Sequence, residues 1–182
     1  MAKRLGISKG LIVNREELQS ILQSMGEQLP SHSRLVLVGG SALILLGSPR
    51  PTIDIDFVGD DLHPNELHKT IIQIAKLMKV HVEPVPLDRF VPLPDGNAER
   101  EIRIGQYGNL EIHVADPYSI ALSKVDRGAD TDLEDVVFLV ENKFIEPTEF
   151  ENIVRNSLAN AGKFDLNPEI LNHLQELKKR LK

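Results

Sequence analysis

The chain has 182 residues, a net charge of −6 at neutral pH and a hydrophobic content of 41%, which is typical of a soluble globular protein. It contains no cysteine, which excludes disulfides and thiolate metal sites, and its acidic charge argues against an extended nucleic-acid-binding surface. No apolar run is long enough to span a membrane, and Met1–Gly6 lacks a signal-peptide core, so we expect a cytoplasmic protein.

The first predicted elements are a helix and a buried strand. Asn14 and Glu17 have the spacing of a capping box, and the helix that they open is expected to run to about residue 28. A continuous apolar run follows at residues 35–38. Such a run is expected of a strand that is covered on both faces.

A glycine-rich turn ends this strand. Gly39, Gly40 and Ser41 separate it from a short apolar helix expected over residues 42–46. Glycine permits a close backbone approach that a Cβ would obstruct, and a helix that starts here points free N–H groups at an anion. The turn is therefore a candidate phosphate-binding loop, although a lone Gly-Gly-Ser is most often only a tight turn.

The next strand carries two candidate metal ligands. Residues 52–58 alternate strictly, which predicts a strand with two different faces. The residues expected in the core are Ile53, Ile55 and Phe57. Asp54 and Asp56 then project as neighbours from the other face, where they repel and raise each other's pKa. A divalent cation such as Mg²⁺ removes this cost. A lone pair of this kind is more often a solvated face.

The glycine turn and the two aspartates, in this order and at this spacing, resemble the signature of the DNA polymerase β-like nucleotidyltransferase superfamily. The resemblance covers roughly residues 34–140. It implies that the glycine-serine turn holds the nucleotide phosphates and that Asp54 and Asp56 bind Mg²⁺. It also implies that a third carboxylate, from a later strand, completes the site.

Further along, the sequence predicts a helix from Pro64, an edge strand near residues 81–83 and a hairpin of residues 101–104 and 110–114. The edge position follows from the prolines after this strand, because proline cannot donate to a central ladder. The hairpin loop is expected over residues 105–109.

Glu111 is our candidate for the third carboxylate. It shares with His113 the face of the strand over residues 110–114 that lies opposite the apolar residues. If this strand lies beside the aspartate strand in a suitable register, Glu111 joins Asp54 and Asp56 as a catalytic and metal-binding residue. The alternative is an ordinary exposed face, which a hairpin strand often has.

Two helices are predicted after the hairpin. Asp116–Pro117 is a typical helix start, and the helix that follows carries Lys124 and Arg127 on one face. Thr131 and Glu134 have the spacing of another capping box, which predicts a helix through about residue 141.

The segment over residues 115–127, with Asp132 and Asp135 after it, is similar to the corresponding segment of AbiEii-like and MenT-like nucleotidyltransferases. These are toxin-type members of bacterial toxin–antitoxin or abortive-infection systems, with many uncharacterised relatives. The resemblance implies that Lys124 contacts a nucleotide phosphate and that Arg127 pairs with Asp132 or Asp135. The alternative is a set of surface salt bridges, worth ~0–1 kcal/mol each.

The remaining sequence predicts further helices, so we expect a nucleotidyltransferase domain over residues 1–145 and a helical C-terminal extension over residues 146–182 packed on it. The predicted fold class is α+β, with a small mixed sheet that bears the site on one side and helices on the other.

With these patterns, the resemblance implies an Mg²⁺-dependent nucleotidyltransferase with two metal ions, or with Mn²⁺ in their place. A hydroxyl of a tRNA, protein or small-molecule acceptor attacks the α-phosphate of a nucleoside triphosphate, and pyrophosphate leaves. The resemblance adds an antitoxin as a partner. The alternative is a non-catalytic nucleotide-sensing or partner-binding module with the same fold, which the clustered carboxylates disfavour. With 4% aromatic residues, the sequence offers no stacking platform for single-stranded nucleic acid.

Overall fold

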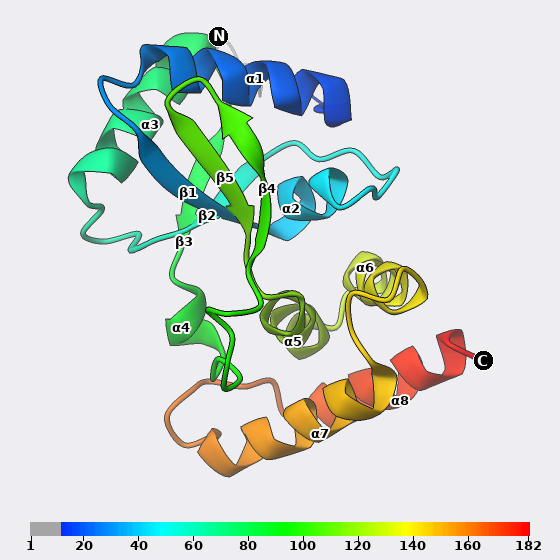
Figure 1. The fold of residues 1–182 in the computed structure, drawn as a ribbon. Coiled ribbons are helices and arrows are strands. Elements are labelled where there is room, and N and C mark those ends of the chain that lie inside the picture. Colours follow the sequence, from blue (N-terminus) through cyan, green and yellow to red (C-terminus); the bar gives the residue numbers. More distant parts are fainter. Residues whose placement is uncertain (1–11) are drawn as a thin grey trace, which may run out of the picture.

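A five-stranded mixed sheet organises the computed structural model, which describes residues 12–182 (Figure 1). Its strands are β1 (Ser33–Val38), β2 (Ile55–Val58), β3 (Val82–Val85), β4 (Ile102–Tyr107) and β5 (Leu110–Val114). Their spatial order is β3–β2–β1–β5–β4. β1 runs parallel to β5 and antiparallel to β2, and β3 runs parallel to β2. The predicted mixed sheet and α+β class are confirmed.

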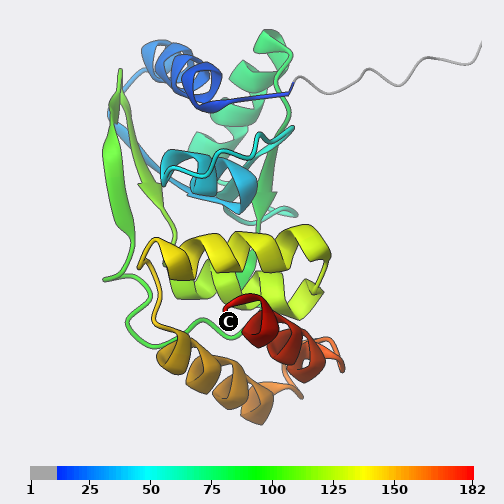
Figure 2. The same cartoon turned by 90° about the vertical axis from the view of Figure 1, so that its right-hand side faces the viewer.

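Helices pack against the sheet and also form a separate layer below it (Figures 1 and 2). The described helices are α1 (Arg15–Gln28), α2 (Gly39–Leu45), α3 (Glu66–Met78), α4 (Leu87–Phe90), α5 (Pro117–Arg127), α6 (Asp130–Glu141), α7 (Pro147–Ser157), α8 (Ile170–Arg180) and a 3₁₀ turn (Leu158–Asn160). α1 packs on β4 and β5, and α3 packs on β3. None of these helices is long and apolar enough to cross a membrane.

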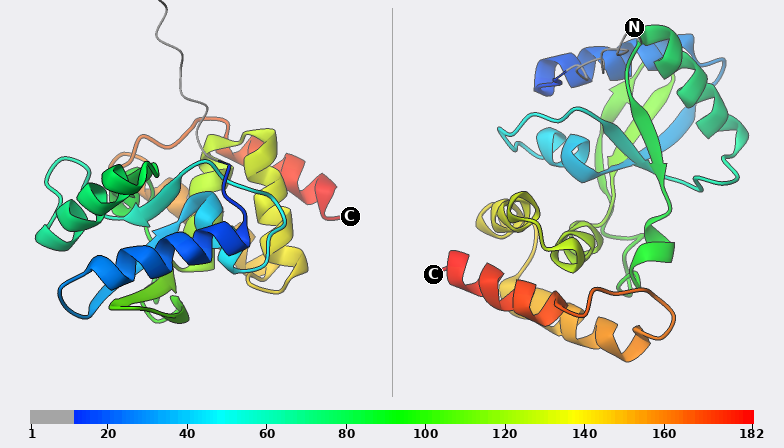
Figure 3. Two further views of the ribbon diagram at one scale, coloured as in Figure 1. Left: turned by 90° about the horizontal axis from the view of Figure 1, so that it is seen from above. Right: turned by 180° about the vertical axis from the view of Figure 1, so that it is seen from behind.

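Helices α5 to α8 form the second layer. α7 and α8 both contact α5, and Arg180 of α8 donates to the Asp130 carboxylate at the start of α6, 2.7 Å away. Seen from behind, α4 lies between the end of β3 and this layer (Figure 3). The domain boundary at residue 145 stays a prediction, but the change from sheet to helical layer occurs earlier, between β5 and α5.

Some of the predicted helix caps and strand ends are confirmed, and others are wrong. The Asn14–Glu17 capping box and the Asp116 N-cap are both present. The predicted Thr131 cap is wrong, because α6 begins at Asp130 and Thr131 already lies inside it. The preceding helix, α5, is capped by Gly128, which has a φ of 71°. β4 also continues to Tyr107, which shortens the predicted hairpin loop. The segment 1–6, in which we expected no signal-peptide core, lies outside the described residues.

The hairpin between β4 and β5 touches α1 backbone to backbone. The N–H of Asn109 donates to the Gly26 carbonyl at 3.0 Å. A Cβ on Gly26 would lie 1.6 Å from the Tyr107 carbonyl oxygen, so only glycine fits here. This contact fixes the hairpin whose second strand leads into α5.

Replacing Gly26 with alanine tests this contact. The added methyl must push α1 away from the hairpin, so Gly26→Ala is expected to lower the free energy of unfolding by more than about 2 kcal/mol. Gly162→Ala is the matched control, because nothing lies within 4 Å of a Cβ there. Urea denaturation of both variants measures the difference, and equal stabilities would contradict the packing described.

Candidate active site

Asp56 occupies the middle of the candidate site. It lies on β2 between Ile55 and Phe57, which are 1% and 0% exposed, so its side chain projects from the opposite face as predicted. In the sheet it lies opposite Val38, the last residue of β1, and opposite Glu83 of β3. Asp56 is therefore placed where β1 turns into α2.

The glycine turn packs directly against the Asp56 carboxylate. Gly39 has a φ of 64°, and a Cβ on it would lie 2.3 Å from Asp56 Oδ2. Gly40 packs against Thr52, whose Oγ1 would lie 2.9 Å from an added Cβ. The first glycine is thus required both by its backbone conformation and by the carboxylate beside it.

Ser41 supports this turn from behind. It is fully buried, and its hydroxyl donates to the Val38 carbonyl at 3.1 Å and to the backbone carbonyl of Asp56 at 3.5 Å. This corrects the predicted phosphate contact of Ser41. Its side chain ties the turn to β2, because the first turn of α2 points it into the protein interior.

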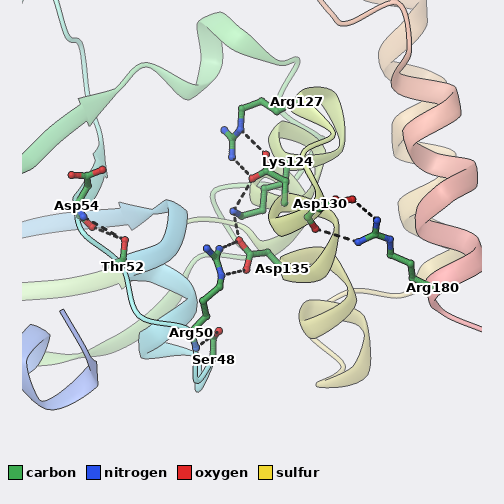
Figure 4. Close-up of polar contacts among 10 residues, drawn as sticks. Ser48, Arg50, Thr52, Asp54, Lys124, Arg127, Asp130, Asp135 and Arg180 are labelled. Carbon is green, nitrogen blue, oxygen red and sulfur yellow. Dashed lines mark hydrogen bonds and ion pairs between the residues drawn. The ribbon is translucent and has the colours of Figure 1, made fainter. Parts of the chain in front are cut away.

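Asp54 lies just before β2 begins. The Thr52 hydroxyl donates to the Asp54 carbonyl at 3.1 Å, and His81 Nδ1 lies 2.8 Å from Asp54 Oδ1 (Figure 4 shows the contacts with Thr52). Thr52 itself bridges to Val13, which keeps this segment out of the β2 ladder. Ile53 is consequently 56% exposed, and its predicted place in the core is wrong.

The electrostatics of Asp56 reflect crowded carboxylates. Burial raises its pKa to about 6, with Asp54 and Glu83 adding to the rise. Arg127 and Lys124 of α5 partly offset this effect. Both cations of α5 are therefore close enough to interact with the carboxylate on β2.

Glu111 lies away from this group, which corrects its prediction as the third carboxylate. β5 pairs with β1, not with β2, and Glu111 lies opposite Arg34 near the start of β1. Asp56 lies opposite Val38, four residues further along, which is roughly 13 Å of strand. The Glu111 carboxylate instead contacts His113 Nε2 at 2.6 Å, and this hydrogen bond holds its pKa below the usual value.

Glu83 is the carboxylate that the sheet brings beside Asp56. The sequence pattern had indicated an edge strand at residues 81–83, and β3 is indeed at the edge, but Glu83 was not singled out. The sequence feature that could have identified Glu83 is its position on the strand that follows the aspartate strand in the chain. Within residues 12–182, however, no three Asp, Glu or His side chains converge so as to bind one ion together.

A buried ion-pair network on α5 and α6 faces the aspartates. Lys124 is 3% exposed, and its ammonium lies 2.6 Å from Asp135 Oδ2 and 3.4 Å from Asp132 Oδ1. Arg127 donates from Nε and Nη2 to both oxygens of Asp132, at 3.1 and 2.7 Å. The predicted pairing of Arg127 with Asp132 or Asp135 is confirmed for Asp132.

Arg50 extends this network to the sheet-bearing half of the molecule. It lies on the loop between α2 and β2, and its guanidinium donates from two nitrogens to both oxygens of Asp135 (Figure 4). Sequence reasoning missed Arg50. The sequence shows that Arg50 lies four residues before Asp54. It does not show the pairing with Asp135, because Asp135 lies 85 residues away in the chain.

One cavity lies between β2, the start of α2 and α5. Its volume is about 450 Å³, and Gly39, Asp56, Lys124 and Arg127 all line it. The cations of α5 and the carboxylate of β2 therefore share one solvent-accessible space. A cavity of this size suits a small-molecule ligand, and its charges suit an anion bound together with a divalent cation.

The sequence matches over residues 16–173 the family described as "Nucleotidyltransferase of unknown function (DUF6036)". The chain belongs to this nucleotidyltransferase family. No curated protein and no solved structure matches the chain significantly. The match includes the glycine turn, the aspartates and the α5–α6 network. Membership of the DNA polymerase β-like superfamily and of its AbiEii-like and MenT-like subdivision stays a prediction.

The pKa of Asp56 predicts how this nucleotidyltransferase responds to pH without metal. Its pKa of about 6 exceeds the ordinary 3.8, so the folded state loses stability as pH rises from about 4 to about 6, and the loss is complete above that range. Asp56→Asn removes the charge and should stabilise the metal-free protein at pH 7.5 by about 1–3 kcal/mol, but hardly at pH 4. Denaturation in EDTA at both pH values measures this, and a destabilised variant at pH 7.5 would contradict it.

Lys124 and Arg127 are expected to differ in their contributions to stability. Lys124→Met leaves buried Asp135 and Asp132 without the ammonium between them, which should cost about 2–4 kcal/mol. Arg127 has a side chain that is 57% exposed, so Arg127→Met should cost only about 1 kcal/mol. Melting curves show which variant loses more stability. A larger loss of stability for Arg127→Met would contradict the prediction and would show that the pairing of Asp132 stabilises the fold more than the pairing of Asp135.

Proposed function

We propose that the protein transfers a nucleoside monophosphate from a nucleoside triphosphate to an acceptor hydroxyl, with Mg²⁺ as cofactor. The observation that carries this proposal is the shared cavity, which Asp56, Lys124 and Arg127 all line. In the reaction the acceptor oxygen forms a bond to the α-phosphorus, the bond from that phosphorus to the pyrophosphate oxygen breaks, and the hydroxyl proton is released.

The carboxylates fit a hard divalent cation. Asp54, Asp56 and Glu83 offer oxygen donors, and their mutual repulsion helps raise the pKa of Asp56, a cost that a bound cation removes. Mg²⁺ is commonly held by one or two carboxylates, with water and substrate phosphates as its other ligands, so convergence of three side chains is not required. When bound, it supplies neutralisation of the charge on the transferred phosphate.

Lys124 contributes the positive charge on the opposite side of the cavity. Asp132 and Asp135 hold its ammonium in place, so it is preorganised to contact a phosphate without reorganisation. Arg127 is fixed on Asp132 by two of its nitrogens and adds a further positive charge at the cavity wall. The site therefore acts by positioning and charge neutralisation, which is the main requirement of phosphoryl chemistry.

The glycine turn completes the nucleotide-binding surface. Gly39 lines the cavity, and the lack of a side chain lets phosphate oxygens approach its backbone. Gly40 and buried Ser41 hold the turn against Thr52 and β2, so their contribution to nucleotide binding is to keep Gly39 in place.

The choice among tRNA, protein and small-molecule acceptors, the use of Mn²⁺ in place of Mg²⁺, and an antitoxin partner stay predictions from the sequence. No contact described above distinguishes among these alternatives.

Substitutions of the three carboxylates test the proposal. Asp54→Asn, Asp56→Asn and Glu83→Gln should each lower Mg²⁺-dependent transfer by about 100-fold or more, since each removes a charge from the metal-binding group. Glu111→Gln is the matched control and should retain wild-type transfer. The assay follows label from each α-labelled triphosphate into cell RNA or protein, alongside triphosphate affinity measured by calorimetry.

Two results would contradict the assignment. If Glu111→Gln abolishes transfer and Glu83→Gln does not, the third carboxylate is on β5 after all. If the wild-type protein binds none of the four triphosphates with Mg²⁺, the proposed function is wrong.

A further inference from the structure

The cavity has a second, apolar wall that the chemistry above does not use. It lies opposite α5 and is formed by the end of β3 and by α4. The apolar residues that contribute to this wall are Val85, Leu87, Phe90 and Val91. The cavity thus has the cations Lys124 and Arg127 on α5 and an apolar surface on β3 and α4, where Arg89 is the charged residue.

Phe90 is the exposed residue of this wall. It is 54% exposed, while Leu87 and Val91 on either side of it are 5% and 0% exposed. Among the described residues, the aromatic ring pairs are Phe57 with His68 and Phe138 with Phe144, so the Phe90 ring packs on no other aromatic ring. A large aromatic side chain that borders a cavity with much of its surface accessible is available to a ligand.

The backbone around Phe90 is held in place. The N–H of Val91 donates to the Leu87 carbonyl at 3.2 Å, and the N–H of Arg89 donates to the Pro86 carbonyl at 2.9 Å. The Arg89 guanidinium pairs with Asp61 and Asp60. Buried anchors on both sides and an ion pair on the neighbouring residue therefore hold the backbone of Phe90 in place, which reduces the entropic cost of a contact with a ligand.

We propose that Phe90 stacks on the base of the bound nucleotide, a role that rests on the function proposed above. Lys124, Arg127 and the aspartates account for the phosphates, and they would bind an inorganic polyphosphate equally well. The apolar wall adds a surface that only a ligand with a flat, hydrophobic end can use. Base–aromatic stacking tolerates any base, so Phe90 contributes affinity for nucleotides as a class.

The test compares a nucleotide with the same anion lacking a base. Calorimetry in Mg²⁺ gives dissociation constants of ATP, GTP, CTP, UTP and inorganic tripolyphosphate for wild type, Phe90→Ala and Phe90→Trp. Phe90→Ala should weaken the tightest triphosphate by about 5- to 30-fold and leave tripolyphosphate within twofold, while Phe90→Trp retains nucleotide affinity. Leu77→Ala is the control, because Leu77 is 80% exposed on α3 and does not line the cavity.

Three outcomes overturn the proposal in distinguishable ways. If Phe90→Ala binds nucleotides as wild type does, the base lies elsewhere, while the proposed function stands. If Phe90→Ala weakens tripolyphosphate as much as nucleotide, the residue shapes the cavity and does not contact the base. If the wild type binds neither, the proposed function fails and the role of Phe90 fails with it.

Discussion

The buried contact between Lys124 and Asp135 is the interaction on which the arrangement of the site depends. Asp135 is shared with Arg50, which lies on the loop that leads into the aspartate strand, so one carboxylate joins the sheet-bearing half to the helical layer. Desolvation makes such buried pairs poor stabilisers compared with apolar packing. Their value here is geometric, because they fix the distance between the carboxylates on β2 and the cations on α5.

The charges around the cavity are balanced in a way that suits a polyanion with a metal ion. Three cations, Arg89, Lys124 and Arg127, and three carboxylates, Asp56, Asp126 and Asp165, line the cavity, so its formal charges balance. On the sheet side, crowded carboxylates raise the pKa of Asp56 to about 6. A triphosphate would be attracted to Lys124 and Arg127 and a divalent cation to Asp56, so the two ligands favour each other's binding.

Sequence reasoning identified the parts of the site that are local in the chain. The glycine turn and the outward position of Asp56 follow from spacing within a few residues, and the pairing of Arg127 with Asp132 or Asp135 was implied by the family resemblance. Glu111 was assigned to the site and Glu83 overlooked because strand order and register are set by long-range pairing, which alternation alone does not reveal. Arg50 and Phe90 were missed for the same reason, since each acquires its role from an element distant in sequence. Ser41 was misassigned because a motif gives the residue type but not the direction of its side chain.

A crystal structure of the protein with Mn²⁺ and a non-hydrolysable triphosphate analogue tests the central claim most directly. Mn²⁺ reports on a Mg²⁺ site, and its anomalous signal locates the ion independently of the phosphates. The account predicts an ion bound to the Asp54–Asp56 pair, with the phosphates between it and Lys124. An ion at Glu111, or phosphates bound outside the cavity that Asp56 and Lys124 share, would contradict it.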